Sequence, residues 1–397
     1  MKRLTFAMLC AAALATAAEV SPAAAKLHRD MLVFDAHVHV INRQFYHGGD
    51  IGERYADGHF DLPRAKEGGL GALFFSLFVT EQYYPQRQEV KQTMRLLDLA
   101  LRQLEKNRAT IELAHNADEL IRIRKSGKIA AVLDLEGGFD LDGDLGVLRD
   151  LYRLGMRSLQ LSAHNWANNF ADSCCSPPKW HGLNEQGRAV VREMNRLGMV
   201  INISHASDES AEQTIDLSTD PVLATHHGLR EFNDIPRNMP DQILKKLAAK
   251  GGVIGFQIGG EFHQRSLFEA RQKRAGKPFW DNSHISTKDM PITELDKLVA
   301  PMFPMVAKPA PEDAGYTVDD YLKVVERAIA LVGEDHVMLG TDFDGGPPLP
   351  AGMRDVRDYP MLTDAMLRHG WSEARIRKFM GENLLRVFGQ VAKKHSH

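Results

Sequence analysis

The chain has 397 residues, of which 44% are hydrophobic and 25% charged, and its formal net charge is −3. This composition is that of a globular protein with a large apolar core, and the length allows one large α/β barrel or two smaller domains. Because no basic block interrupts the sequence, we expect neither a nucleic-acid partner nor binding to an anionic membrane.

Residues 1–25 have the pattern of a cleavable secretory signal peptide. Lys2 and Arg3 form a basic start, residues 4–18 are mainly apolar, and the alanines at 23–25 offer a cleavage site. The apolar stretch is too short to span a bilayer comfortably. We therefore expect cleavage near Ala25 and a periplasmic or secreted protein without a stable membrane span; an uncleaved anchor is the alternative.

Short apolar segments alternate with longer amphipathic ones along the rest of the chain, which predicts repeated β–α units. Amphipathic helices are predicted at 90–106, 183–198 and 318–333. About eight β–α units in one chain favour a single α/β domain over residues 26–397, a (β/α)8 TIM-type barrel, with a doubly wound open sheet as the alternative. The predicted strands are 31–37, 71–79, 129–136, 157–164, 199–205, 221–227, 252–258 and 336–342.

The connection after the seventh predicted strand is unusually long, from about residue 261 to residue 316. It is polar, aromatic and proline-rich, and includes KPFWDNSH and MFPMVAKPAP. Connections of this length are usually functional or disordered. We predict a partial lid or an interface segment, and a structureless insertion is the alternative.

Ionisable residues lie at the ends of most of the predicted strands. A parallel barrel brings these ends to one face, where barrel enzymes carry their chemistry. One histidine on an apolar strand is usually an ordinary core residue, but such repetition is hard to explain in that way. Since imidazole and carboxylate are good zinc ligands, the sequence predicts a metal site on this face. The residues are His37, His39, Glu136, His164, His205, His226, His227, Asp342 and Asp344.

The stretch VFDAHVHV at 33–40 shows how the first strand would supply ligands. Successive side chains of a strand point to opposite faces. Asp35, His37 and His39 are therefore predicted to share the inner face, with Phe34 and its alternate neighbours on the outer face. Both imidazoles could then reach one ion.

A similar spacing at 57–63, DGHFDLP, is predicted not to bind metal. His59 and Asp61 are also one residue apart, but no apolar strand precedes them. The following residues, PRAKEGG, read as a turn. For His227 and Asp344 we expect supporting roles rather than ligation.

Cysteine is scarce. Without the leader residue Cys10, only Cys174 and Cys175 remain, which excludes a disulfide scaffold. Two thiols, a vicinal disulfide and an intermolecular bridge all stay open.

With these residues assembled, the chain resembles the membrane (renal-type) dipeptidase family, peptidase family M19, whose members are binuclear zinc enzymes with an amidohydrolase-like barrel. The resemblance runs from about Val33 to the MGENLLRVF segment near the C-terminus. It rests on ordered motifs: LEGG, LSAHNWANNFADS, GLNEQGRAVVREMNRLGMVINISHAS, THH followed by IPRNMPD, GGVIGF and LGTDFDG. Each motif is weak alone, but their order is specific.

The resemblance implies a role for each matching residue and two Zn²⁺ ions per chain. One zinc would be held at His37 and His39 with Asp342 nearby, and Glu136 would bridge to the second, held by His205 and His226. His164 would polarise the substrate carbonyl, Asp342 would transfer protons, and Arg237 would bind the substrate carboxylate.

One position departs from the family pattern. Typical members have His-x-Asp at the first motif, whereas this chain has His37-x-His39. The change removes one negative charge, although imidazole still binds zinc. The first metal could be held differently, replaced by another divalent ion, or lost.

The sequence thus predicts an exported zinc-dependent dipeptidase that cleaves short peptides with a metal-activated water. The first alternative is a related metal-dependent amide hydrolase or tailoring enzyme acting on a peptidic natural product such as a siderophore. The second is an inactive barrel that binds small peptides. The expected partner is a small peptide substrate, and a homodimer is left open.

Overall fold

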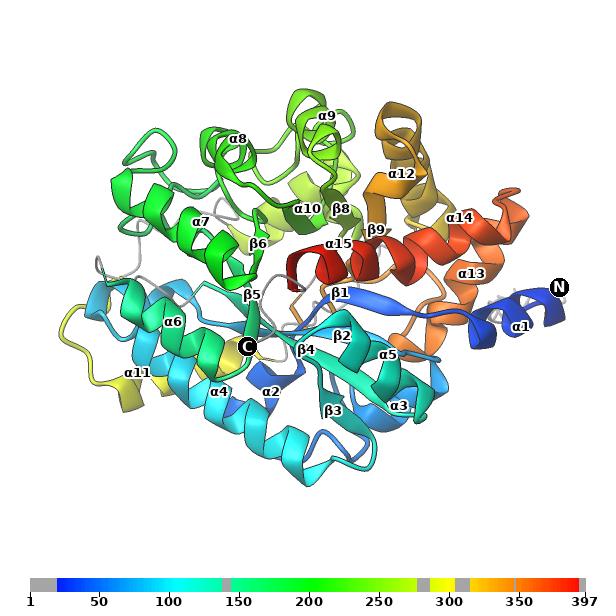
Figure 1. Ribbon diagram of the computed structural model, residues 1–397, viewed down its shortest axis with the longest axis horizontal. Coiled ribbons are helices and arrows are strands. Elements are labelled where there is room, and N and C mark those ends of the chain that lie inside the picture. Colours follow the sequence, from blue (N-terminus) through cyan, green and yellow to red (C-terminus); the bar gives the residue numbers. More distant parts are fainter. Residues whose placement is uncertain (1–19, 138–143, 277–285, 304–314, 346–347, 393–397) are drawn as a thin grey trace, which may run out of the picture.

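The computed structural model describes residues 20–137, 144–276, 286–303, 315–345 and 348–392. Parallel strands follow one another around a nearly closed barrel, in the order β1-β2-β4-β5-β6-β7-β8-β9 (Figure 1). A parallel bridge between Val38 and Phe343 joins the end of β1 to the segment after β9. The predicted TIM-type barrel is confirmed. Its strands are β1 (Phe34–Val38), β2 (Ala72–Phe78), β4 (Ile129–Glu136), β5 (Met156–Gln160), β6 (Val200–Asn202), β7 (Leu223–His227), β8 (Val253–Phe256) and β9 (Val337–Leu339).

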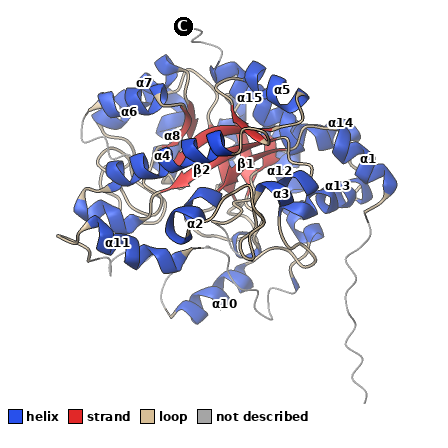
Figure 2. Ribbon diagram, turned by 90° about the horizontal axis from the view of Figure 1, so that it is seen from below, coloured by secondary structure: helices blue, strands red, loops and turns tan. Residues whose placement is uncertain are grey.

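Helices surround the strands, which lie at the centre of the view in Figure 2. The helices predicted at 90–106, 183–198 and 318–333 are present as α4, α7 and α12. A capping box of Thr317 and Asp320 begins α12. The helices are α1 (Pro22–Asp30), α2 (Val40–His47), α3 (Leu62–Glu67), α4 (Glu89–Lys106), α5 (Ala117–Lys125), α6 (Leu145–Arg153), α7 (Glu185–Leu197), α8 (Asp208–Leu217), α9 (Asp241–Ala249), α10 (Arg265–Ala275), α11 (Ile292–Val299), α12 (Val318–Val332), α13 (Tyr359–Arg368), α14 (Glu373–Arg377) and α15 (Asn383–Ala392).

Two local predictions were wrong. A short strand that the sequence did not predict, β3 (Ile111–Leu113), pairs with the start of β4. Its three residues are too few to show a period. The PRAKEGG segment is not a turn but contains helix α3, because the Asp61 carboxylate caps it by accepting a hydrogen bond from Arg64 N–H at 2.8 Å.

Five strands end earlier than predicted, and three of them leave a predicted site residue outside the sheet: His164, His205 and Asp342 lie in the loops that follow β5, β6 and β9. Side chains next to the strand ends turn the backbone out of the sheet. For example, Asn202 Oδ1 accepts a hydrogen bond from Ser204 N–H at 2.9 Å. Such local bonds compete with the strand ladder.

The register of the sheet shifts within β1. Asp35 pairs with Leu73, whereas Val38 pairs with Phe75, so two residues of β1 lie opposite one residue of β2. This is a β-bulge, a feature that re-aims side chains next to active sites.

The bulge overturns the predicted common face of Asp35, His37 and His39. The Asp35 carboxylate accepts a hydrogen bond from the Tyr359 hydroxyl of α13, between the barrel wall and the helices. His37 and His39 instead approach Glu136 inside the barrel. The prediction assumed regular alternation, which the extra residue interrupts.

A second register shift lies in β7, which is the sixth of the predicted strands. Ala224 pairs with Ile254, but His227 pairs with Phe256. The extra residue lets His226 point into the barrel, where it stacks on the ring of His37.

The end of the barrel at which the strands begin is filled by apolar side chains that pack against α15. This helix contacts β1, β6, β8 and β9. It covers the end of the barrel opposite to the predicted site. The buried cluster includes Phe34, Phe74, Val132, Val200, Leu223, Val253, Met338, Leu384 and Phe388.

The described part of the long connection at 261–316 contains helices, so a structureless insertion is wrong for this part. It contains most of a 3₁₀ turn, η2 (Gly260–Phe262), then α10, α11 and η3 (Ala300–Met302); residues 277–285 and 304–314 lie outside the described part. Helix α11 contacts η1 (Glu81–Gln86), a 3₁₀ helix that follows β2. The segment therefore forms an interface within the chain.

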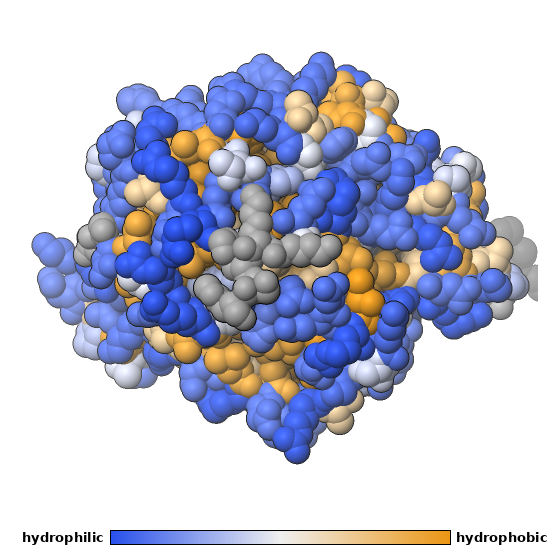
Figure 3. Space-filling model, in the orientation of Figure 1, coloured by the Kyte–Doolittle hydropathy of each residue, from blue (hydrophilic) through white to orange (hydrophobic). Residues whose placement is uncertain are grey.

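Residues 1–19 of the predicted signal peptide lie outside the described residues, whereas residues 22–25 form the first turn of α1. Ala24 of this turn is buried. No helix among the described residues has the length and apolar character of a membrane span. Hydrophilic residues predominate on the face shown in Figure 3.

Candidate metal centre

The structure brings all predicted metal ligands together, with His164, at the carboxyl end of the barrel. Their ligand atoms form three overlapping groups, and within each group the atoms lie within 4.8 Å of one another. The groups are His37, His39 and Asp342; His37, Glu136 and His226; and Glu136, His164 and His205.

Glu136 occupies the centre of the cluster. Its Oε2 atom lies 2.6 Å from His37 Nε2 and 2.9 Å from His39 Nε2. Its Oε1 atom lies 3.1 Å from His205 Nε2 and 3.8 Å from His226 Nε2. One carboxylate thus serves two sets of imidazoles, which is the arrangement expected of a ligand that bridges two cations.

Three residues of the site have a backbone conformation that is uncommon for non-glycine residues. The φ angles are 48° at His164, 62° at His205 and 61° at Asp342. Backbone strain of this kind concentrates at functional sites, because the surrounding structure must hold it in place. It reflects the sharp exits from β5, β6 and β9.

The far nitrogens of the imidazoles are held by hydrogen bonds. His205 Nδ1 donates to Asn165 Oδ1 at 3.0 Å, and an amide oxygen can only accept, so Nε2 of this neutral ring keeps its lone pair for a metal. His37 Nδ1 lies 2.9 Å from Ser76 Oγ, which donates to Asp134. The corresponding partner of His226 Nδ1 is Thr225 Oγ1 at 2.9 Å. His39 Nδ1, by contrast, is buried without a hydrogen-bond partner.

The charges around the cluster favour a protonated ring at His37 and neutral rings at His205 and His226. Burial lowers the pKa of His37, but Glu136 and its neighbouring carboxylates outweigh burial and raise this pKa to about 10. Burial and nearby positive charge hold the pKa values of His205 and His226 well below the ordinary range, which keeps both rings neutral. His205 and His226, neutral beside a carboxylate of lowered pKa, are donors that zinc prefers. A cation at the centre would displace the proton that the carboxylates favour on His37, so the residues fit such an ion.

Arg237 points a largely unpaired guanidinium toward this cluster. The side chain is only 3% exposed, and one nitrogen, Nη2, donates to the backbone oxygen of His226 at 2.6 Å. Its Nε and Nη1 atoms are buried without a hydrogen-bond partner. Since buried donors are nearly always paired, this arginine is suited to bind an anionic ligand.

The remaining residues singled out by the sequence have other partners. Asp344 accepts a hydrogen bond from the backbone N–H of His59, and Asp61 caps α3 and pairs with Arg64. His59 and Asp61 thus remain outside the three ligand groups. His227 is not in these groups and instead lines a small space together with Ala211 of α8 and Ile243 of α9.

The residues that support the ligands were not predicted from the sequence. Asp134 could have been found, because it lies two residues before Glu136 on the same face of β4. Glu81, which binds His164 Nδ1, carried no such signal, since it belongs to a loop segment after β2.

Cys174 and Cys175 form a vicinal disulfide, which decides between the three alternatives left open by the sequence. The pair lies next to the metal centre: the backbone N–H of Cys174 donates to His205 O at 2.7 Å.

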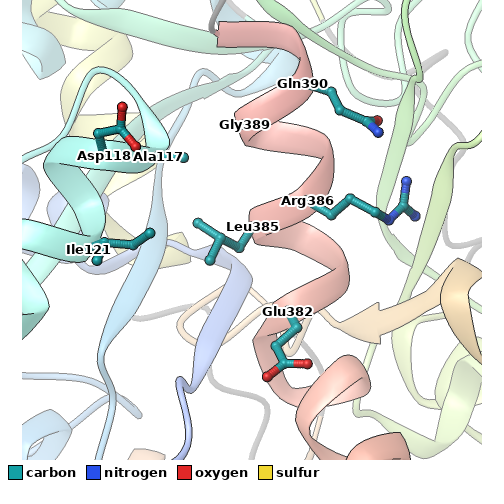
Figure 4. Close-up of a pocket in the computed structure, with 8 residues that line it drawn as sticks. All are labelled: Ala117, Asp118, Ile121, Glu382, Leu385, Arg386, Gly389 and Gln390. Atoms are coloured by element: carbon teal, nitrogen blue, oxygen red, sulfur yellow. The ribbon is translucent and has the colours of Figure 1, made fainter.

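A groove of about 490 Å³ lies between α5 and α15 (Figure 4). Its lining mixes Asp118, Glu382 and Arg386 with apolar residues and contains no histidine. Since α15 covers the starts of the strands, this groove lies at the other end of the barrel from the metal centre.

A parallel barrel that gathers buried histidines and carboxylates at its carboxyl end has the fold and the donor set of a metal-dependent hydrolase. The model of the membrane dipeptidase family (peptidase family M19) matches residues 22–397. The chain belongs to this family, as its motifs suggest.

Named relatives agree with the family. The chain is 32% identical over 342 residues to dipeptidase tcpJ of Claviceps purpurea, a match that covers 84% of this chain and 69% of that protein. It is 30% identical over 380 residues to dipeptidase 3 of Mus musculus, covering 92% of this chain and 65% of that protein.

Solved structures share the fold. The probable dipeptidase PvdM from Pseudomonas aeruginosa superposes with a TM-score of 0.79 at 23% identity, covering 94% of this chain and 98% of that one. A metallo peptidase from Rhodobacter sphaeroides, liganded with a phosphinate mimic of the dipeptide L-Ala-D-Ala, gives a TM-score of 0.69 at 24% identity, covering 91% and 99%.

Proposed function

We propose that the protein is an exported zinc-dependent dipeptidase that hydrolyses the amide bond of short peptides. The observation that carries this proposal is the position of Glu136, whose two carboxylate oxygens face different sets of imidazoles. Its oxygens would be shared by a pair of zinc ions, with His37 and His39 on one side and His205 and His226 on the other.

When bound, the zinc pair would supply Lewis acidity and a water of lowered pKa. The chain's own residues then orient the substrate and move protons. Burial lowers the pKa of His164, but Glu81 and Glu136 outweigh burial and raise this pKa, which favours a ring with a proton on both nitrogens. Its Nε2, which lies 3.3 Å from Glu136 Oε1, faces the ligand cluster and would donate a hydrogen bond to the carbonyl oxygen as this oxygen gains negative charge. Asp342 Oδ1 would accept the proton of the attacking water and return it to the leaving amine.

Arg237 would set the length of the substrate. Its unpaired Nε and Nη1 atoms would bind the C-terminal carboxylate of a dipeptide in two parallel hydrogen bonds. Because this arginine is buried beside the metal ligands, a longer peptide could not place both its carboxylate at Arg237 and its first amide bond at the metals.

A substrate panel tests this function. The panel contains L-Ala-L-Ala, L-Ala-D-Ala, L-Ala-L-Ala amide and tri-L-alanine, each incubated with zinc-loaded protein. We expect release of alanine from one or both free dipeptides and much slower turnover of the amide and the tripeptide. No turnover of any dipeptide by protein that holds its zinc would contradict the proposal.

His39 supports a second candidate, a related metal-dependent amide hydrolase that tailors a peptidic natural product such as a siderophore. An imidazole in place of the family's aspartate changes the charge of the ligand set. This candidate predicts turnover of chemically modified peptides, with none of either free dipeptide of the panel. Binding of dipeptides without turnover would instead indicate an inactive barrel.

Export is part of the proposal and rests on the leader pattern of residues 1–25. Fractionation of cells that express the full chain, followed by N-terminal sequencing, tests it. We expect a periplasmic or secreted protein that begins at or close to Lys26; protein that remains in the cytoplasm with its leader would contradict export.

A further inference from the structure

Glu81 connects the segment after β2 with the interior of the site. Its Oε1 atom accepts a hydrogen bond from His164 Nδ1 and a second one, at 3.1 Å, from the backbone N–H of Asn165. Glu81 is only 6% exposed, so water does not compete strongly for its carboxylate. The His164 ring therefore has one nitrogen bound to Glu81 and the other directed at Glu136.

We propose that Glu81 is a positioning residue for His164. A carboxylate can only accept hydrogen bonds, so the bond fixes a proton on His164 Nδ1 and the plane of the ring. With the ring fixed, Nε2 faces the place where the substrate carbonyl would lie. This inference rests on the proposed function, because it names the residue that orients the carbonyl-binding imidazole.

The same carboxylate supports the backbone that carries His164. This residue has a φ angle of 48°, and the bond from Asn165 N–H to Glu81 holds the chain just beyond it. Asn165 Oδ1 in turn accepts the hydrogen bond from His205 Nδ1. Glu81 thus holds the segment of His164 and Asn165 in place. This segment carries the carbonyl-binding imidazole and the amide that orients the ring of His205.

The long connection after β8 holds the helix η1 that carries Glu81. Thr287 Oγ1 donates to Gln82 O at 2.8 Å, and the Tyr83 hydroxyl donates to Asp296 Oδ1 of α11 at 2.7 Å. Arg95 of α4 binds both oxygens of Asp296. The segment predicted as a partial lid or an interface segment therefore stabilises Glu81 from outside the barrel.

The test compares Glu81→Gln and Glu81→Ala with the wild type. Glu112→Gln is the matched control, because Glu112 binds Arg122 and Lys128 on the outside of the barrel. The zinc-loaded proteins carry 15N-labelled histidine, and the spectrum of His164→Gln assigns the His164 signals. One readout is the Nδ1–H resonance of His164, and the others are zinc content, kcat and KM for the best dipeptide.

We expect a far-downfield Nδ1–H resonance in the wild type and the control. It should move upfield in Glu81→Gln, since a neutral amide is the weaker acceptor, and disappear by exchange with water in Glu81→Ala. The kcat of both variants should fall on the order of 10- to 100-fold, with zinc content and KM preserved.

The resonance needs no substrate, so it separates this inference from the proposed function. If the wild type cleaves no dipeptide but shows the Glu81-dependent resonance, the function fails and the positioning role stands. An unchanged resonance in both Glu81 variants would overturn the positioning role, whatever the activity. So would wild-type kcat in both variants of an active enzyme, or a loss of zinc with an unchanged resonance.

Discussion

Asp35 and His37 are two residues apart in β1, yet their side chains lie on different sides of the barrel wall. Asp35 binds Tyr359 of α13, and His37 lies 2.6 Å from Glu136 at the centre of the metal cluster. The β-bulge between them makes this reversal possible. The geometry of the first ligand motif therefore depends on one extra residue in the strand.

Replacing His39 by aspartate restores the family's usual pair. His39 Nε2 lies 3.3 Å from Asp342 Oδ1, and its Nδ1 has no partner to lose. Because a carboxylate also binds zinc, His39→Asp should keep its zinc and retain or raise dipeptide hydrolysis. Metal analysis and kcat/KM measure this outcome. A collapse in zinc content would show that the site depends on the second imidazole.

Because Gly345 has no side chain, there is room beside it for the His39 ring. A Cβ atom at this position would lie 2.2 Å from His39 Cδ2 and 2.5 Å from Asp342 Oδ1. Gly345→Ala should displace the ring and lower zinc affinity roughly 10- to 100-fold, as loss of a supporting contact does. Titration with a zinc-competing chelator measures the affinity. Gly315→Ala is the control, since no atom of the described residues lies within 4 Å of its Cβ; equal affinities of the two variants would contradict the prediction.

Arg237→Lys should weaken recognition of the free carboxylate. Lysine cannot form the paired bonds of a guanidinium, and a hydrogen bond to a charged group contributes about 1.5–3 kcal/mol. We expect KM for a free dipeptide to rise about 10- to 100-fold. The dipeptide amide, which lacks the carboxylate, should be affected little. Arg102→Lys, at the exposed pair with Asp98 on α4, should leave both values near wild type, and an equal effect of Arg237→Lys on dipeptide and amide would argue against the carboxylate role.

The buried His263 should make stability depend on pH. Burial lowers its pKa from 6.5 to about 4, although its Nε2 bond to Gln257 O acts in the opposite direction. Above pH 6.5 neither the folded nor the unfolded state binds this proton; as pH falls below 6.5 the unfolded state binds it first, so the free energy of unfolding decreases.

The contribution of His263 should reach about 2 kcal/mol at pH 5. Urea unfolding of wild type and His263→Gln at pH 7 and pH 5 measures it, and the comparison of the two proteins cancels metal effects. The glutamine amide can still donate to Gln257 O. The variant should lose less stability between the two pH values; equal losses would contradict a depressed pKa at this site.

The sequence predicted the barrel and the residues that meet at its carboxyl end. Both follow from periodic signals, because apolar runs mark the strands and ligand types recur after them. The prediction that the Asp35 side chain shares a face with His37 was wrong. The bulge that separates them depends on the pairing of β1 with β2 and not on the residue pattern of β1 itself. Glu81 was missed for a similar reason: its partner His164 is 83 residues away, and only the folded chain brings the two together.

The most direct test of a metal-dependent dipeptidase is the rate of dipeptide hydrolysis before chelation, after chelation and after zinc is restored. We predict that the purified protein carries about two metal ions per chain, that removing them abolishes hydrolysis and that zinc restores it. Glu136→Gln, which alters the shared ligand, should not recover under the same treatment. Undiminished hydrolysis by metal-free protein, or full activity of Glu136→Gln, would contradict the account.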